Sequence, residues 1–330
     1  MDILVTGAGG MVGSHMVEFF HARRENVIGT YYKPTIDIKE LSPEIKMVEC
    51  DVRYAPNVER IVMEFQPEQI YHLAAQSYPT VSWKHPYETM EINVNGTIAV
   101  FESIKKVREF LDKDYDPMVV VACSSAEYGD TFNQLAESEI HIRETAELHP
   151  LHPYGVSKVG QDLIAFQYFM NDHIRCIRAR IFNSTGIRKT NDVTSDFTYR
   201  AVQAERCGIY ELRAGNLDTR RAIMDQRDLV HALVLLAEKG KAGEVYNISS
   251  ERIYQMKDIV KMIEKQIGHE LKITTDPALL RPTDEAVIVG DVTKLKQDTG
   301  WKQMIPMEET VKDMLDYWRS KECKGIDSTV

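Results

Sequence analysis

The 330-residue sequence has no long apolar run and none of the patterns that direct a protein into or across a membrane. A membrane span needs roughly 18 consecutive apolar residues, and every apolar run here is shorter. A secretory signal needs a basic start, an apolar segment and a small-residue cleavage site, and this combination is missing. Internal repeats and low-complexity tracts are also absent. We therefore expect a cytoplasmic protein without a membrane partner.

Cysteine is scarce, and the five cysteines include no CxxC pair. Three of them lie in or beside apolar runs, so we expect reduced, mostly structural thiols. His149 and His152 flank Pro150 in a proline-rich loop, and we interpret them as loop residues rather than metal ligands. With 40 Lys and Arg against 50 Asp and Glu, the formal net charge is −10, which argues against nucleic acid as a partner. A local basic pocket for a small phosphate ligand remains open.

The chain has enough apolar residues, 43% of the total, to bury a large core in one large or two coupled domains. Short β-branched runs alternate with segments whose apolar residues recur every three to four positions, which is typical of alternating strands and helices. This alternation predicts an α/β fold with a Rossmann-type, doubly wound parallel sheet that binds ligands at the carboxyl ends of its strands. The predicted strands cover residues 3–5, 26–31, 46–49, 69–73, 118–123 and 175–180.

A glycine-rich loop follows the first predicted strand. Gly7, Gly10 and Gly13 have the spacing GxxGxxG and lead into a helix that starts near Met11. Glycine lets the backbone turn tightly and approach a pyrophosphate, and a helix amino terminus offers free amide groups to it. Three glycines alone can be purely structural, but their place between a strand and a helix predicts a dinucleotide site. Met11 and Val12 belong to the same expected site.

The choice of dinucleotide depends on the end of the second strand. The residues there are Tyr31, Tyr32 and Lys33, without the carboxylate that binds a free adenosine ribose. Lys33 could meet a 2′-phosphate, which favours NADP over NAD, but an ordinary solvated lysine leaves NAD open. Asp51 and the adjacent Val52 follow the third strand and are placed for the adenine side. The alternative for Asp51 is a cap of the next helix.

Tyr154 and Lys158 stand four residues apart, one turn on the same face of a predicted helix. A nearby ammonium favours the phenolate form, so the pair could exchange protons near neutral pH. Such a pair is often only a surface contact. In this sequence two further features favour a catalytic pair. The glycine-rich loop lies upstream, and Ser124 stands at a predicted strand end about 30 residues before the tyrosine.

At this point the chain resembles the extended short-chain dehydrogenase/reductases over nearly its whole length. The family motifs appear in order as "TGAGGMVG", "HLAAQS", "NVNGT", "CSSAEYG" and "HPYGVSK". Within the family it looks most like the enzymes of GDP-mannose metabolism, the 4,6-dehydratases and the GDP-4-keto-6-deoxymannose reductases. The segments that carry this likeness are "LAAQSYPTVSW", "RIFNSTG", "AGNLDTRR", "LLRPTDEAVIVGD" and "DTGWKQMIP".

The resemblance implies catalytic roles. Ser124 would hydrogen-bond the reacting sugar oxygen, Tyr154 would exchange its proton, Lys158 would bind the nicotinamide ribose and lower the tyrosine pKa, and Asn93 would organise the site. The strand-end residues Leu73, Ala74 and Ala75 would line the cofactor, an NAD(P)(H). The resemblance also implies a homodimer or homotetramer.

The second half of the chain is expected to bind a GDP-linked sugar. We expect a Rossmann domain over 1–183, with a return to it at about 222–250, and a mainly substrate-binding domain over 184–330 with a loose tail at 321–330. Ser77 and Ser82 would touch the sugar, with local turn bonding as the alternative for both. By the resemblance, Asn183, Arg221 and Arg281 would contact the diphosphate or ribose, and guanidinium groups suit phosphate oxygens. Ser125 and Val193 complete the expected substrate set.

One departure from the family pattern separates the possible reactions. A 4,6-dehydratase places Glu or Asp two residues after its catalytic Ser or Thr, and this position is Ala126, which cannot move a proton. The expected activity is therefore reduction or dehydrogenation at C4 of the sugar. A dehydratase with another base, an epimerase and a catalytically silent nucleotide-sugar-binding protein remain alternatives. In an extended strand end, Ser124 and Ala126 would face one way and Ser125 and Glu127 the other, unless a bulge shifts the register.

Overall fold

The centre of the molecule is a seven-stranded parallel sheet in the order β12-β7-β5-β4-β1-β2-β3. The structure is a computed structural model that describes residues 1–132, 139–190, 192–276 and 287–321. The predicted Rossmann-type α/β fold is confirmed. The strand order reverses between β1 and β4, so the carboxyl ends of these strands mark the expected ligand site. The strands are β1 (Asp2–Thr6), β2 (Asn26–Tyr31), β3 (Lys46–Glu49), β4 (Gln69–His72), β5 (Met118–Ser124), β7 (Cys176–Ile181) and β12 (Val245–Ile248).

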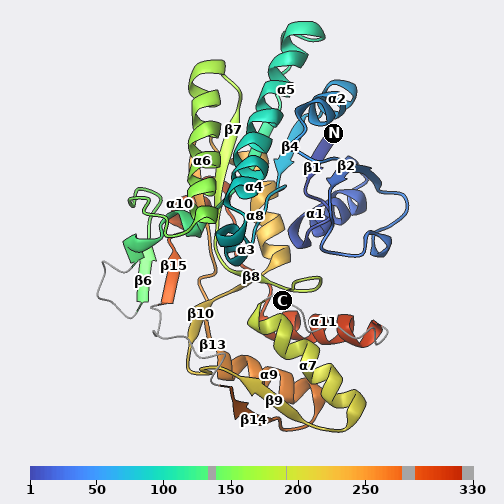
Figure 1. Cartoon of the computed structure of the whole chain (residues 1–330), viewed down its shortest axis with the longest axis vertical. Helices are drawn as coiled ribbons and strands as arrows, with labels where there is room; N and C mark the ends of the chain where they lie inside the picture. Colours follow the sequence, from blue (N-terminus) through green and yellow to red (C-terminus); the bar gives the residue numbers. More distant parts are fainter. Residues whose placement is uncertain (133–138, 191, 277–286, 322–330) are drawn as a thin grey trace.

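Helices cover both faces of this sheet (Figure 1). On one face lie α1 (Met11–Ala22), α8 (Gln226–Lys239) and α10 (Thr293–Thr299). On the other lie α2 (Ala55–Phe65), α5 (Gly96–Phe110) and α6 (Pro153–Asp172). Alternate strand residues point to opposite faces, so Val120 joins the first core and its neighbour Val119 the second. Because both of their faces are buried, the central strands β1 and β5 are nearly continuous apolar runs, which is why the sequence predicts them. The edge strand β12 was not predicted from the sequence.

A smaller layer with its own core lies in the lower part of Figure 1. Its helices are α7 (Val193–Cys207), α9 (Met256–Ile267) and α11 (Met307–Ser320), beside the parallel strands β9 (Glu211–Ala214) and β14 (Lys272–Thr275). Between α7 and α9 the chain returns to the large sheet through α8 and β12. Three further two-stranded ladders join β8 (Ser184–Thr185) to β11 (Met224–Asp225), β10 (Arg220–Ala222) to β13 (Ile253–Gln255), and β6 (Glu139–Ile142) to β15 (Val287–Gly290).

Short helices follow the carboxyl ends of the central strands and shape the site. α3 (Pro79–Lys84) and α4 (Pro86–Met90) come after β4, and a π-helical turn, η2 (Glu91–Asn95), leads into α5. The 3₁₀ turns are η1 (Ile38–Glu40), η3 (Ser125–Glu127) and η4 (Asp130–Phe132).

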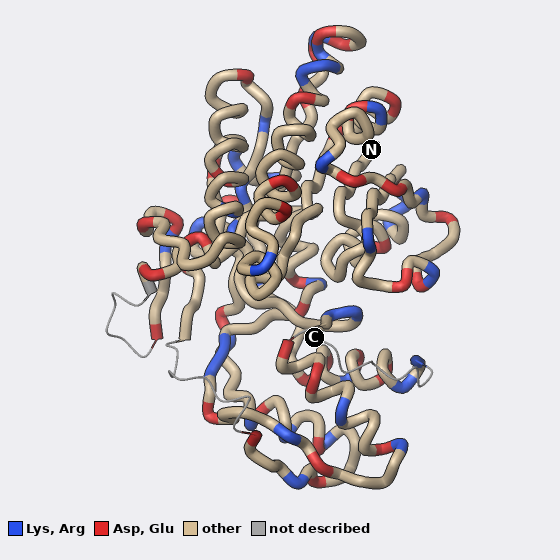
Figure 2. The backbone as a smooth tube through the Cα atoms, in the orientation of Figure 1, with Lys and Arg blue, Asp and Glu red and all other residues tan. Residues whose placement is uncertain are grey.

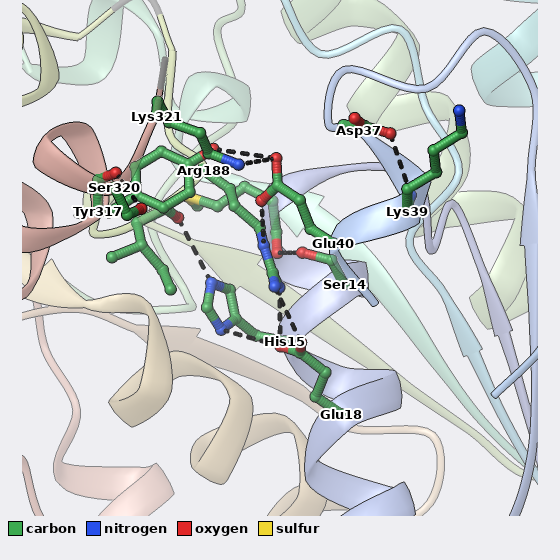
Figure 3. A network of polar contacts seen from close by, with 12 residues as sticks. Ser14, His15, Glu18, Asp37, Lys39, Glu40, Arg188, Tyr317, Ser320 and Lys321 are labelled. Atoms are coloured by element: carbon green, nitrogen blue, oxygen red, sulfur yellow. Dashed lines mark hydrogen bonds and ion pairs between the residues drawn. The ribbon is translucent and has the colours of Figure 1, made fainter. Parts of the chain in front are cut away.

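Arg188 connects the two layers (Figure 3). It follows β8 and is only 8% exposed. Its guanidinium donates to the two carboxylate oxygens of Glu18 on α1, at 2.7 and 2.8 Å, and its Nε donates to Glu40 at 3.2 Å. Tyr317 and Lys321, at the end of α11, also contact Glu40. We call Glu18, Glu40, Arg188, Tyr317 and Lys321 the interface cluster, because they tie α1 and η1 to the smaller layer.

The remaining composition-based expectations have partial answers. Among the described residues, no helix is long and apolar enough to cross a membrane. Cys50, Cys123 and Cys176 are free and buried, and Cys207 is free and exposed. Cys323 and the expected tail from 322 onward lie outside the described residues. Figure 2 shows acidic and basic positions interspersed along both layers.

Candidate active site

The glycine-rich loop fits the pyrophosphate of a dinucleotide. Gly7, directly after β1, has a φ of +73°, and a Cβ there would lie 2.7 Å from the backbone nitrogen of Ala74. A Cβ on Gly13 would lie 2.3 Å from the carbonyl oxygen of Gly7. The Gly10 amide donates to that same carbonyl oxygen at 3.0 Å, and α1 begins at the next residue, Met11. Strand, loop and helix are thus too close for side chains, and the amide groups of the first helical turn are left for an anion.

The segment after β4 lies against this loop. The amide groups of Leu73 and Ala74 both donate to Thr6, the last residue of β1, to its carbonyl and its hydroxyl oxygen respectively, at 3.2 Å. Leu73, Ala74 and Ala75 are half-buried. Met11 and Val12, in the first turn of α1, are half-buried as well. The predicted cofactor-lining residues of β1, α1 and β4 therefore meet along one edge of the sheet.

The predicted adenine side of the dinucleotide site contains a cation, Arg53, that the sequence analysis did not single out. The guanidinium carbon of Arg53 lies 5.7 Å from the ring centroid of Tyr32, and the Lys33 ammonium lies 5.4 Å from the same centroid. Tyr31 ends β2 and is half-buried. Lys33 has a φ of +47°, the left-handed region, which turns the chain away from the end of β2. The signal was present in "CDVRY", where the arginine follows Asp51 by two residues.

Asp51 is engaged by this arginine and does not cap the next helix. Its oxygens accept from the Arg53 backbone amide at 3.0 Å and from Arg53 Nη2 at 2.7 Å. The hydrogen bonds from the Arg53 side chain lower the pKa of Asp51. The residue before α2 is Tyr54, so the capping alternative is wrong. Val52 is buried and packs against Gly96, where a Cβ would lie 2.7 Å from the valine methyl group.

The predicted catalytic residues come together at the end of β5 and the start of α6. Ser124 ends the strand, while Tyr154 and Lys158 occupy the first turns of the helix, and all three are largely buried. The Lys158 ammonium donates to the carbonyl oxygen of Ala122 at 2.8 Å and lies 5.8 Å from the centroid of the Tyr154 ring. His152 accepts a hydrogen bond from the Gly155 amide at 3.0 Å, so this loop histidine caps α6.

Burial dominates the ionisation of this group. It raises the pKa of Tyr154 to about 12, partly opposed by a hydrogen bond with Ser124. It lowers the pKa of Lys158 to about 8. In this structure burial outweighs the other effects on the tyrosine pKa, because the phenol is desolvated and the ammonium of Lys158 is held by a carbonyl oxygen. The lowering of the tyrosine pKa by Lys158 stays a prediction. The phenol is protonated at neutral pH.

Asn93 is hydrogen-bonded both to the loop after β4 and to α6. It is fully buried in η2, where its Oδ1 accepts from the Gln76 amide at 2.8 Å and its Nδ2 donates to the Gln76 carbonyl at 3.0 Å. The same Nδ2 donates to the Ser157 hydroxyl on α6 at 2.8 Å. Gln76 in turn donates to the carbonyl of Tyr78 at 3.1 Å. Asn93 thus fixes the loop after β4 against the helix that carries Tyr154.

The turn after Ser124 differs from the predicted extended strand end. β5 ends at Ser124, and residues 125–127 form the 3₁₀ turn η3, so the alternating register predicted for this stretch is wrong. The Ser124 hydroxyl accepts from the Ala126 amide at 3.2 Å, and the Ser124 amide donates to Glu127 Oε1 at 2.7 Å. These reciprocal bonds are a capping box. Ser125 and Ala126 are half-buried, whereas Glu127 is fully buried.

The expected substrate residues are more scattered. Ser77 and Asn183 are exposed after β4 and β7, and Val193, 37% exposed, is the first residue of α7. Arg221 lies in β10, where its guanidinium donates to the carbonyl of Arg220 at 3.2 Å. Ser82 is buried, and its hydroxyl donates to the carbonyl of Pro79 at 2.7 Å, which favours the local alternative over a sugar contact. Arg281 lies outside the described residues.

Comparisons with known proteins agree with this geometry. The family model described as GDP-mannose 4,6 dehydratase matches residues 4–314. GDP-6-deoxy-D-mannose reductase of Pseudomonas aeruginosa is 27% identical, with 77% of this chain and 81% of that protein aligned. GDP-mannose 4,6-dehydratase of Vibrio cholerae is 24% identical, with 94% and 92% aligned. The structure of RMD from Pseudomonas aeruginosa complexed with NADPH superposes with a TM-score of 0.79 at 22% identity, covering 97% of this chain and 100% of that one. The chain belongs to the GDP-mannose 4,6-dehydratase family within the extended short-chain dehydrogenase/reductases, as the sequence motifs predicted.

Proposed function

We propose that the protein is an oxidoreductase that acts at C4 of a GDP-linked sugar, most simply a reductase of a 4-keto-6-deoxymannose-type substrate. The observation that carries the proposal is a complete Ser124, Tyr154 and Lys158 group beside a nucleotide loop, with Ala126 at the position of the dehydratase base. The family description and the two relatives support a GDP-sugar substrate. Other GDP-hexoses and GDP-heptoses belong to the same proposed substrate class.

The residues present suit a reduction. A bound nicotinamide dinucleotide would supply the hydride to the sugar C4. Ser124 would hydrogen-bond the C4 oxygen, and Tyr154 would donate its proton to that oxygen as the ketone becomes a hydroxyl. The high pKa of the Tyr154 phenol, about 12, keeps the proton on the residue that must give it away. Lys158, held by the Ala122 carbonyl, would stabilise the phenolate that remains until solvent returns the proton.

We also propose NADPH as the preferred cofactor, with NADH open. Lys33 and Arg53 place two cations beside Tyr32, where the adenosine ribose would bind, and cations there suit a 2′-phosphate. One structural relative is described as complexed with NADPH. Arg53 is partly neutralised by Asp51 and Glu88, so Lys33 is the cation more available to a phosphate.

A dehydratase is the main alternative, and the family description favours it. Elimination needs a base at C5 of the sugar, and neither residue near the expected position supplies one. Ala126 carries no ionisable group, and Glu127 is fully buried with its carboxylate turned to the Ser124 amide and Arg180. An epimerase needs only the three catalytic residues, whereas a silent binding protein has no need of them.

Two substrates separate these functions. Purified protein is incubated with GDP-mannose and an oxidised cofactor, and separately with its 4-keto-6-deoxy product and NADPH or NADH. We expect oxidation of NADPH with the keto sugar and no keto sugar from GDP-mannose. Formation of 4-keto product from GDP-mannose would refute the reductase. Tyr154→Phe, which removes only the exchangeable proton, is the matched control and should lose at least about 10²-fold in kcat.

We further propose a cytoplasmic homodimer or homotetramer with the two domains expected from the sequence, 1–183 with 222–250, and the remainder. One face of α6 supports self-association, because Val156, Leu163, Phe166 and Met170 on it are 39–54% exposed. Exposed apolar stripes of this kind are typical of subunit interfaces. Light scattering of the purified protein tests the oligomeric state.

A further inference from the structure

Glu127 is a buried carboxyl group that touches the backbone of the catalytic serine. It is fully buried, and its Oε1 accepts from the Ser124 amide at 2.7 Å. The Ser124 hydroxyl closes the turn by accepting from the Ala126 amide at 3.2 Å. The position and direction of the serine hydroxyl therefore depend on this carboxyl group.

The charges around Glu127 come from three elements. Strand β7 contributes Arg178 and Arg180. Helix α6 contributes Asp162, Lys158 and Tyr154. Strand β5 contributes Cys123, and Tyr128 follows in the chain directly after η3. The thiol of Cys123 and carboxylate oxygens of Glu127 and Asp162 lie within 4.8 Å of one another. We call Glu127, Asp162, Arg178 and Arg180 the strand-end cluster.

The two carboxylates of the cluster are not equally well paired. Asp162 receives Arg178 Nη1 at 2.7 Å and Arg180 Nε at 2.9 Å. Glu127 Oε2 lies 3.2 Å from the same Arg180 Nε, and among the described residues it has no hydrogen-bond partner. Arg180 also donates to the Tyr128 hydroxyl and the Glu144 carbonyl, both at 3.1 Å. Of the two acids, Glu127 is therefore the one with the weaker set of partners.

The ionisation of Glu127 follows from this imbalance. Burial, together with the negative charge of Asp162, raises the pKa of Glu127 to about 8. In its ionised form Glu127 also raises the pKa of Tyr154 and of Lys158, since a negative charge favours the protonated form of both. The cluster is thus linked to the catalytic pair by charge as well as by the Ser124 amide.

We propose that Glu127 is a positioning residue, which sets the reach of the Ser124 hydroxyl through its backbone and, when ionised, keeps the reactive proton on Tyr154. The proposal rests on the proposed function in that it takes Ser124, Tyr154 and Lys158 as the catalytic group. It assigns a use to a buried carboxyl group, which costs free energy to desolvate and is therefore unexpected without a specific role.

Glu127→Gln separates the two roles, because the amide oxygen still accepts from the Ser124 amide but carries no charge. Without that charge Tyr154 gives up its proton at lower pH, so the alkaline fall of kcat for keto-sugar reduction should move down by about one pH unit. Glu127→Leu also removes the acceptor, and kcat should fall by about tenfold or more at every pH. An unmoved profile in a folded Glu127→Gln variant would overturn the proposal.

Asp228→Asn is the matched control. Asp228 is also a buried carboxylate that accepts two backbone amides, those of Met304 and Ile305 at 3.0 Å, but it lies on α8, which carries none of the three catalytic residues. Its loss should reduce thermal stability and leave the pH profile of kcat in place. A shift of the profile in this control equal to that of Glu127→Gln would show a general effect of lost buried carboxylates and overturn the specific role.

A second readout needs no substrate. The pKa of Glu127 is higher in the folded chain than its ordinary 4.5, so the stability that its proton contributes is complete below pH 4.5 and is lost as pH rises towards 8. Between these two pH values the unfolding equilibrium constant of the parent should therefore increase with pH more steeply than that of Glu127→Gln. The difference in slope should be up to about tenfold per pH unit. Parallel curves would overturn the proposal. If the two stability curves differ as expected but the protein does not turn over a GDP-sugar, only the proposed substrate would be refuted.

Discussion

The strand-end cluster and the interface cluster both place an arginine between carboxylates, but they differ in access to water. In the strand-end cluster the side chains of Glu127 and Asp162 are 0% exposed and that of Arg180 is 5% exposed. In the interface cluster Arg188 is equally hidden at 7%, yet Glu18 is 34% and Glu40 is 16% exposed. Carboxylates that reach solvent can be rehydrated when their arginine is lost, and fully buried ones cannot. The loss of stability when the arginine is replaced therefore depends on how deeply the acids are buried, more than on the burial of the arginine itself.

The largest effect is expected for Arg180→Met, which leaves Asp162 paired with Arg178 and removes the guanidinium beside Glu127. Breaking a buried ion pair in this way costs about 3–5 kcal/mol. Urea denaturation at pH 7 measures the loss, and lowering the pH should recover part of it because the acids then take up protons. A loss below about 1 kcal/mol would remove the distinction between the clusters.

A smaller effect is expected for Arg188→Met, since Glu18 and Glu40 can turn to water. We expect about 1–2 kcal/mol in the same denaturation experiment, the cost of lost hydrogen bonds to charged groups. The loss should shrink in high salt, unlike that of Arg180→Met, because partly exposed pairs are screened. Equal losses for the two variants at low and high salt would contradict the role of carboxylate exposure.

The smallest effect is expected for Lys321→Ala, at the outer edge of the interface cluster. The Lys321 side chain is 34% exposed and meets only Glu40 among the acids of that cluster. Exposed ion pairs contribute about 0–1 kcal/mol, so the midpoint of unfolding should barely move. A loss as large as that of Arg188→Met would show that the end of α11, rather than the arginine, holds the two layers together.

The two clusters also show which features can be predicted from the sequence and which cannot. Patterns within a short stretch predicted six strands of the seven-stranded sheet, all but β12, together with the Gly7 loop and the Tyr154 and Lys158 pair, because each depends on neighbours a few residues away. The bounds of β2 and β3 agree with the predicted 26–31 and 46–49. The tight glycine loop and the adjacency of Tyr154 and Lys158 could therefore be predicted before the fold was known, while their roles in binding and catalysis stay predictions.

Features that depend on distant partners were not visible. The turn after Ser124 forms around Glu127, whose charge is balanced by Arg180 on another strand. Without that partner a strand end seemed to continue, and the predicted facing of residues 124–127 was wrong. The interface cluster has the same origin, since Arg188 meets Glu18 across 170 positions in the chain. A charged residue expected to be buried predicts that a partner of opposite charge exists, but the sequence does not show which residue that partner is.

The central claim is hydride transfer at C4 of a GDP-linked sugar, and isotope transfer tests it most directly. GDP-4-keto-6-deoxymannose is reduced with NADPH that carries deuterium at the reactive nicotinamide carbon, and the product is examined by nuclear magnetic resonance. We predict a single deuterium on C4 of the sugar, and none with Tyr154→Phe over the same time. Deuterium at another carbon, or its absence from a product that the wild-type chain forms, would contradict the account.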